Sequence, residues 1–322
     1  MPSIPKDPTN TSRINSADTD SERELSLLEA QHLRELGSIE RTQSNYQHAL
    51  QCFEHSLSIF RKYGVSASEG YVLGNIGSVY HEQGLFEQAA QCVHEGLALV
   101  RSVYDKRGEG TLLGILGNIY RSQGKHQRAL DLFTQALEIS QQIGDVHTEG
   151  INLGNLGCVY QAQGEYEQAL QMHSQALTIS QTYGDGGNEG INHGNIGDAL
   201  FAMKQFEQAK QSLRLAIKIG DNNAMMTSGV FRASLALLLA TQGQIEEAYL
   251  LLKESEQEVA PYAEEYAKYL VKKAQVRNLG GDIKGAKASL QQAQTLATEL
   301  NVLEESEVGQ AIQRGVTLLH AG

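Results

Sequence analysis

Asparagine is the residue whose type and spacing carry the clearest chemistry in this chain of 322 residues. Asn75, Asn155 and Asn195 each stand in a Gly-Asn-Ile-Gly or Gly-Asn-Leu-Gly setting, at separations that are multiples of forty residues. Asparagine is a mediocre helix former. Its side-chain amide both donates and accepts hydrogen bonds, which suits pairing with the backbone of an extended peptide. Two alternatives are that duplication copied the residue, or that it bonds to a neighbouring helix.

No pattern of catalytic or metal-binding residues accompanies these asparagines. The ten histidines are scattered, with no HExxH pair and no Cys-His-carboxylate cluster at usable spacing. Six of them fall on polar helix positions or turns and are interpreted as solvated: His32, His48, His55, His81, His94 and His126. Cys52, Cys92 and Cys158 lie far apart and indicate neither a disulfide framework nor a zinc site. We expect a protein that is not an enzyme and that has no cofactor and no bound metal.

Two further segments resemble sites and have simpler interpretations. The run from Asp185 to Asn188 lacks the alternating carboxylates of a calcium loop and is predicted to be a flexible joint. Tyr262, Tyr266 and Tyr269 form a helical stripe, which favours core packing over a ligand cage.

Composition limits the classes of partner. The formal net charge is -12, and an acidic chain without a Lys/Arg cluster repels nucleic-acid phosphates and anionic lipids. No run of about eighteen apolar residues is present, so membrane insertion is not expected. The first residues lack the apolar run of a secretory signal. We therefore expect a cytoplasmic protein that binds neither nucleic acid nor membrane.

A forty-residue period sets the architecture. Glu-Gly pairs recur at Glu69, Glu109, Glu149 and Glu189, each followed by the Gly-x-x-Gly element. Such self-similarity indicates stacked copies of one small unit, each of which buries its apolar face against its neighbours. The four prolines are Pro2, Pro5, Pro8 and Pro261, so the intervening chain is free of a helix breaker.

The unit from residue 150 to 189 predicts two helices. Its first helix has apolar or small residues at helical spacing, and Gly164 and Gly184 are expected to end the first and second helices in the left-handed conformation. Five glycines recur at one phase inside the first helices, and close approach to an alanine of the second helix explains them. These glycines are Gly37, Gly77, Gly117, Gly157 and Gly197, and the alanines are Ala49, Ala89, Ala129, Ala169 and Ala209.

The same residues resemble the tetratricopeptide repeat (TPR) signature. The matching positions are Leu153, Leu156, Gly157, Tyr160, Gly164, Tyr166, Ala169 and Ala176. The forty-residue period resembles Pins-type (LGN-type) spindle-orientation adaptors and many bacterial repeat proteins, with kinesin light chain a more distant relative. The usual tryptophan and the closing proline of the signature are absent. The resemblance covers residues 70 to 209 best.

Together, the period and the resemblance predict an all-α fold, a right-handed superhelical solenoid of stacked helix-turn-helix repeats. We expect a disordered N-terminal arm over residues 1–20. About seven helical hairpins follow over residues 21–303, clearest over residues 70–229. A C-terminal capping helix over residues 304–322 carries Val308, Ile312, Val316 and Leu319 on one stripe.

The first helices are expected to line the concave inner wall of the superhelix. Positions i, i+4 and i+7 along each first helix then point into the groove. These predicted partner-binding residues are Tyr71, Asn75, Ser78, Thr111, Ile115, Asn118, Ile151, Asn155, Cys158, Ile191, Asn195 and Asp198. The resembling adaptors use asparagine at this position to hold a peptide backbone.

The chain lacks the basic groove residues that the resembling families use to bind acidic groups. Pins-type repeats often place arginine directly after the Glu-Gly pair, where this chain has Tyr71, Thr111, Ile151 and Ile191. The basic clamp of chaperone-binding repeats is also unmatched. The predicted partner is therefore another protein, bound through an extended or helical peptide segment that is not strongly acidic.

Two functions fit this sequence. The first is a non-catalytic scaffold or adaptor that binds a peptide segment of a partner in the concave groove. The alternative is a peptide-responsive regulatory protein that modulates the activity of a target.

Overall fold

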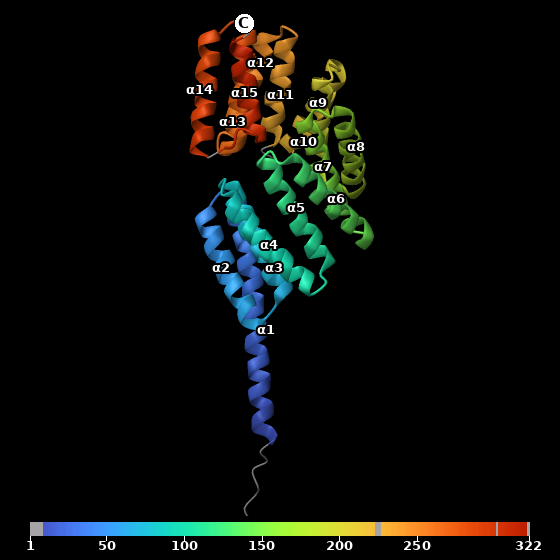
Figure 1. Cartoon of the computed structure of the whole chain (residues 1–322), viewed down its shortest axis with the longest axis vertical. Helices are drawn as coiled ribbons and strands as arrows, with labels where there is room; N and C mark the ends of the chain where they lie inside the picture. Colours follow the sequence, from blue (N-terminus) through green and yellow to red (C-terminus); the bar gives the residue numbers. More distant parts are fainter. Residues whose placement is uncertain (1–8, 223–226, 301, 321–322) are drawn as a thin grey trace, which may run out of the picture. The chain divides into compact units, whose positions relative to one another are not determined.

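The computed structural model describes residues 9–222, 227–300 and 302–320 of the chain (Figure 1). Side-chain surroundings are described for residues 20–222, 227–300 and 302–317. Within the described part the chain forms fifteen helices and no strand, which confirms the predicted all-α solenoid. None of the described helices is both long enough and apolar enough to cross a membrane.

Successive helices form the pairs of a helical-repeat array. In chain order they are α1 (Thr9–Thr42), α2 (Tyr46–Tyr63), α3 (Ser66–Glu82), α4 (Phe86–Ser102), α5 (Lys106–Ser122), α6 (His126–Ile143), α7 (Val146–Gln163), α8 (Tyr166–Tyr183), α9 (Gly186–Ala202), α10 (Phe206–Asn222), α11 (Thr227–Thr241), α12 (Ile245–Val259), α13 (Ala263–Leu279), α14 (Ile283–Glu299) and α15 (Glu307–His320). Odd-numbered helices up to α13 are first helices of a hairpin, and each is followed by its second helix. Because helices next to each other in the chain pack together, most contacts are local.

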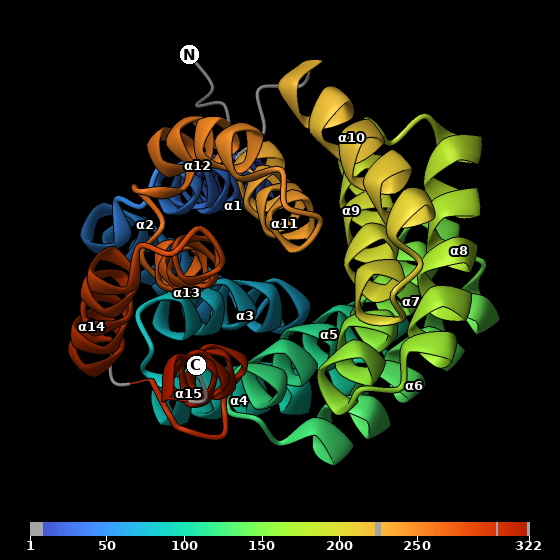
Figure 2. The same cartoon turned by 90° about the horizontal axis from the view of Figure 1, so that it is seen from above.

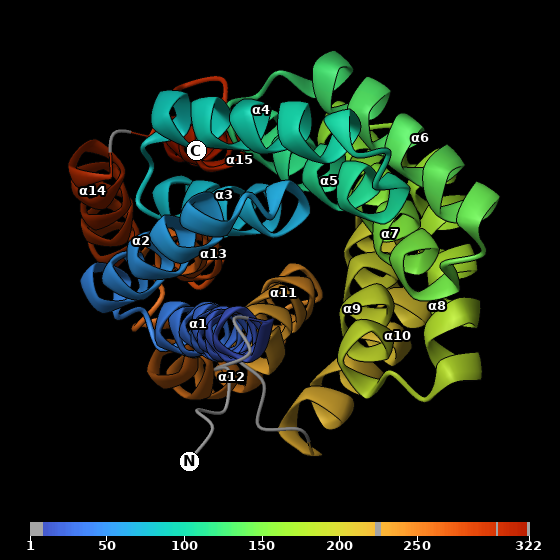
Figure 3. The same cartoon turned by 90° about the horizontal axis from the view of Figure 1, so that it is seen from below.

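The chain divides into two compact units, residues 1–112 and residues 113–322. In the first unit α1, α2, α3 and α4 lie side by side (Figure 3). In the second unit the hairpins that begin with α7, α9, α11 and α13 follow one another, and α15 packs on α13 and α14. The forty-residue period gave no sign of this division, which falls inside α5.

The arm predicted over residues 1–20 differs from the structure in part. Residues 1–8 lie outside the described residues, and residues 9–20 form the first turns of α1. Polar composition alone predicted disorder over residues 9–20. The segment has no proline beyond Pro8, and its backbone continues directly into the apolar helix that follows.

Helix ends follow the sequence closely. Gly164 and Gly184 close α7 and α8 with φ of 82° and 68°, as the sequence predicted. Asp185 does not form a flexible joint. Its carboxylate accepts hydrogen bonds from the Asn188 backbone N–H at 3.0 Å and from the Asn188 amide at 2.7 Å, so it caps the start of α9.

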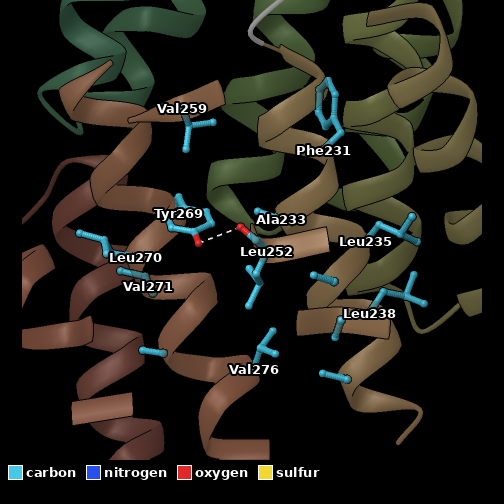
Figure 4. Close-up of a cluster of buried hydrophobic side chains, with 14 of the residues drawn as sticks. Phe231, Ala233, Leu235, Leu238, Leu252, Val259, Tyr269, Leu270, Val271 and Val276 are labelled. Carbon is cyan, nitrogen blue, oxygen red and sulfur yellow. Dashed lines mark hydrogen bonds between the residues drawn. The ribbon is translucent and has the colours of Figure 1, made fainter. Parts of the chain in front are cut away.

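A large apolar cluster of the second unit joins its later hairpins (Figure 4). Phe231, Leu238 and Leu252 meet Leu270 and Val276 there. The Tyr269 hydroxyl lies inside this cluster and donates to the Leu252 carbonyl oxygen at 3.0 Å. Tyr269 is therefore a core residue, as predicted. Tyr266 stacks on Tyr269 with ring centroids 5.7 Å apart, whereas Tyr262 is more exposed.

The recurring first-helix glycines mark close approach between the two helices of a hairpin. A Cβ added at Gly117 would stand 2.7 Å from the Phe133 ring, and one at Gly157 would stand 2.6 Å from the His173 ring. The glycines at positions 37, 77 and 197 meet Phe53, Val93 and Leu213 in the same way. The side chains that need this space stand four residues after the alanines that the sequence suggested. They are the large core residues of each second helix.

Gly117→Ala tests this packing, because helix propensity and steric overlap change the free energy of unfolding in opposite directions. Propensity alone favours alanine by about 1 kcal/mol, whereas overpacking against a buried ring costs about 1–3 kcal/mol. We expect net destabilisation in urea unfolding of the full chain. The alanine should cost less in a Phe133→Leu background, and a stabilised Gly117→Ala protein would contradict the proposed packing.

His173 takes the position that Phe133 holds in the preceding hairpin, and its side chain is fully buried. Burial lowers the pKa of His173 to about 4 from 6.5, partly opposed by the neighbouring Asn192 amide. The unfolded chain therefore binds one more proton between these two pH values. Stability is lost as pH falls from about 6.5 to about 4, by about 3 kcal/mol over the interval.

We expect His173→Phe to remove this part of the acid sensitivity. The measurement is the free energy of unfolding in urea at pH 7 and at pH 4.5, for the wild type and the variant. An equal loss of stability in both proteins would refute the assignment.

Candidate peptide-binding wall of the first helices

The predicted wall in the second unit is built by consecutive first helices. Figure 2 shows α7 and α9 on the inner side of this unit's curve, with α6 and α8 on the outer side. The Asn195 amide of α9 lies 3.6 Å from the Cys158 sulfur of α7, so predicted site residues of neighbouring first helices do come together. Positions 155 and 195 are both asparagine, and positions 151 and 191 are both isoleucine, so parts of this wall repeat from α7 to α9.

The predicted residues of this wall are mostly neutral and half buried. Ile151 is exposed, and the others keep part of their surface: Ile115, Asn118, Asn155, Cys158, Ile191, Asn195 and Asp198. The amides of Asn118 and Asn155 have no hydrogen-bond partner among the described residues. Since a side-chain amide carries two donors and an acceptor, these groups have bonding capacity to offer a ligand.

In the first unit most of the predicted residues already have partners. The Ser78 hydroxyl donates to the Gly74 carbonyl oxygen at 3.1 Å, and the Thr111 hydroxyl donates to the Arg107 carbonyl oxygen at 3.0 Å. Burial and the neighbouring Asp105 carboxylate raise the pKa of Tyr71 to about 12. Within the described part of this unit, Asn75 is the predicted residue whose side chain has no hydrogen bond.

The structure contains a second row of asparagines that was not among the predicted site residues. Asn152 and Asn192 directly follow Ile151 and Ile191, and both are buried. The oxygen of Asn152 would stand 3.5 Å from a Cβ at Gly114, and that of Asn192 at the same distance from one at Gly154. These residues therefore pack against the preceding first helix. Their own forty-residue spacing was the signal that could have revealed them.

A cluster of charged residues lies next to the wall and was also missed. The Glu307 carboxylate at the start of α15 lies 3.0 Å from the Arg121 guanidinium of α5 and 3.4 Å from the Lys268 ammonium of α13. Lys268 also lies 3.0 Å from Glu265. Burial raises the pKa of the nearby Cys158 thiol. The Arg121 and Lys268 cations oppose this rise, and the Glu307 carboxylate adds to it. This part of the wall is therefore in contact with the chain's own later helices.

The turn after α5 fits closely against the segment before α15. A Cβ at Gly124 would overlap the Glu305 carbonyl oxygen, so only glycine fits at this contact. His126 lies beside it with both ring nitrogens buried, and burial lowers its pKa. The prediction that His126 is solvated is wrong, because the segment that covers it comes from about 180 residues further along the chain.

Glu307→Gln tests the ionic link between α5, α13 and α15. It removes the carboxylate that pairs with Arg121, whereas Lys268 keeps its contact with Glu265. Because the Glu307 side chain keeps 40% exposure, we expect a loss of about 1–2 kcal/mol, between surface and buried pairs. Glu299→Gln, on the exposed end of α14, is the matched control.

The link also predicts a pH dependence. Lys268 and Arg121 lower the pKa of Glu307 to about 2 from 4.5, against its burial. The stabilisation is therefore present above pH 4.5 and is lost as pH falls toward about 2. Urea unfolding of wild type and Glu307→Gln should converge over this interval. A constant difference between the two proteins down to pH 2.5 would contradict the link.

Solved structures show a similar fold. The apo form of RapI matches with a TM-score of 0.68 at 14% identity, covering 85% of this chain and 99% of that one. A Rap protein complexed with competence and sporulation factor matches with a TM-score of 0.65 at 14% identity, covering 94% and 98%. Aspartyl phosphate phosphatase F from Bacillus subtilis matches with a TM-score of 0.68 at 13% identity, covering 91% and 76%. At such identities the likeness concerns the fold alone. No curated protein matches the sequence.

Two family models match the sequence itself. The model of the tetratricopeptide repeat matches residues 68–142, and that of the MalT-like TPR region matches residues 107–320. Neither singles out the Pins-type branch. Repeats of this kind are generally non-catalytic and serve in protein interaction. The chain thus belongs to the tetratricopeptide repeat proteins, with more than half of its length forming a MalT-like TPR region.

Proposed function

We propose that this protein is a non-catalytic scaffold that binds a peptide segment of a partner protein along the first helices of its second unit. The observation that carries the proposal is the pair of amides at Asn118 and Asn155, which have no hydrogen-bond partner among the described residues. Asn155 shares its phase of the repeat with Asn195, and Asn118 stands three residues later in phase, on the predicted groove face of α5. An extended peptide that crosses the first helices meets such an amide at successive helices.

The side chains around these amides define the chemistry of the partner. Ile115, Ile151 and Ile191 offer apolar contact, and Asp198 is the one charged residue among the predicted contacts. Such a wall favours an uncharged or weakly basic segment with apolar side chains. A cytoplasmic location, as the sequence predicts, is compatible with this role.

A second function, peptide-responsive regulation, has its own support. The fold resembles that of a Rap protein whose structure was solved with competence and sporulation factor. In this chain the Arg121–Glu307 contact joins the first hairpin of the second unit to its last helix. A peptide that binds beside Cys158 can strengthen or break this contact and so change the shape of the unit. Small-angle scattering with and without a selected peptide separates this function from a rigid scaffold.

Selection from a random peptide library on the full chain tests the first proposal. We expect selected peptides to be neutral or weakly basic. We expect Asn118→Ala/Asn155→Ala to weaken their binding at least about fivefold in fluorescence anisotropy, since each lost hydrogen bond contributes about 0.5–1.5 kcal/mol.

The control is Gln171→Ala/Gln175→Ala on the exposed face of α8. This pair should bind as tightly as the wild type. If the asparagine variant also binds as tightly, the peptide does not lie on the predicted wall.

A further inference from the structure

Helix α1 carries an exposed apolar stripe that nothing in the proposed function uses. Leu25, Leu28, Leu36 and Ile39 are 65%, 48%, 41% and 54% exposed. Their spacing of three, eight and three residues places them on one face of the helix. Ala30 lies on the opposite side of the helix and packs in the apolar cluster with α2. These four exposed residues are called the α1 stripe below.

The repeat explains what the α1 stripe is built to contact. Leu36 and Ile39 stand forty residues before Ile76 and Val79 of α3, which are 6% and 0% exposed. Ile76 and Val79 lie in one apolar cluster with Phe60 of α2, the second helix of the preceding hairpin.

The same relation holds further along the array. Leu116 and Ile119 of α5 and then Leu156 and Val159 of α7 continue the series at forty-residue steps, and all four are buried. Leu156 and Val159 lie in one apolar cluster with Phe133 of α6, which is again the second helix of the preceding hairpin. Within the first unit, no helix among the described residues occupies the corresponding face of α1. The α1 stripe is therefore the kind of face that, in later hairpins, packs against the second helix of the preceding hairpin, and here it lacks that partner.

The charges beside the α1 stripe indicate which helix it accepts. At 100° per residue, Glu22 and Glu29 fall along one border of the stripe, and Glu24 and Glu35 fall along the other. All four are exposed, and none has an ion-pair partner among the described residues. Both borders of the stripe are therefore acidic.

Arg34 and Arg41 of α1 are engaged elsewhere and do not neutralise these borders. The Arg41 guanidinium pairs with Glu82 of α3, and the Arg34 guanidinium lies 6.0 Å from the centre of the Tyr71 ring. A second copy of the stripe would place glutamates against glutamates, which disfavours pairing between two copies of this face.

We propose that the α1 stripe docks an amphipathic helix of a partner protein whose apolar face is bordered by lysine or arginine. The partner's helix takes the place that the second helix of a preceding hairpin has elsewhere in the array. Its apolar residues cover Leu25, Leu28, Leu36 and Ile39, and its cations meet the two acidic borders. This site lies on the first unit and is independent of the wall proposed for peptide binding.

Two designed peptides of eighteen residues test the proposal on the full chain. Both have the same leucine stripe, bordered by lysines in one and by glutamates in the other. We expect the lysine peptide to bind at least tenfold more tightly in fluorescence anisotropy, with an affinity that falls in 0.5 M salt. Equal binding of the two peptides, or no binding of either, would overturn the proposal.

Variants of the full chain locate the binding. Leu28→Ser/Ile39→Ser should weaken the lysine peptide at least tenfold, and Glu24→Gln/Glu29→Gln/Glu35→Gln should remove its preference over the glutamate peptide. The control Leu250→Ser changes an exposed residue of α12, at 65%. All changed side chains are on the surface, so unchanged thermal unfolding verifies the fold. Unaltered binding by the stripe variants would place the peptide elsewhere.

Two further measurements separate this proposal from its alternatives. Asn118→Ala/Asn155→Ala should bind the lysine peptide like the wild type, because those residues belong to the other site. In sedimentation velocity, we expect the full chain to form no dimer through the α1 stripe. A dimer of this kind would be recognised by its loss in Leu28→Ser/Ile39→Ser. Such a dimer would mean that a second copy covers the stripe, and the proposal would be wrong.

Discussion

Each hairpin of this protein buries only part of its apolar surface, and the rest is covered only by the next hairpin. This constraint organises the whole array. Inside a hairpin, a first-helix glycine admits a large core residue of the second helix, as Gly117 admits Phe133. Between hairpins, Val79 of α3 lies in one apolar cluster with Phe60 of α2, the preceding second helix. The stabilising contacts are thus short in sequence and repeat along the chain.

The two ends of such an array meet this constraint differently. In the second unit, α15 packs on α13 and α14, and Val308 and Ile312 are buried there. At the other end, α1 begins the stack and keeps the apolar residues that an internal first helix would bury. One end is covered by the chain's own last helix, whereas the other has an apolar stripe between acidic borders.

Charge adds a longer-range connection to this local scheme. Glu307 joins Arg121 and Lys268, so the first hairpin of the second unit is tied to its last helices. The intact link contributes little net stability, whereas removal of one partner leaves an uncompensated charge and is costly. It also lies beside Cys158, at the predicted peptide wall. The wall proposed for peptide binding and the link between α5 and α15 therefore share a neighbourhood around Cys158.

The sequence by itself determined the features that depend on neighbours in the chain. The forty-residue period, the glycines at 164 and 184 and the apolar spacing of the helices predicted the all-α repeat and its helix ends, because these are set by local backbone and packing preferences. Only the tertiary structure decided which residues meet over long distances. The burial of His126, the pairing of Glu307 with Arg121 and the division inside α5 depend on contacts between distant segments, and no periodic pattern encodes them.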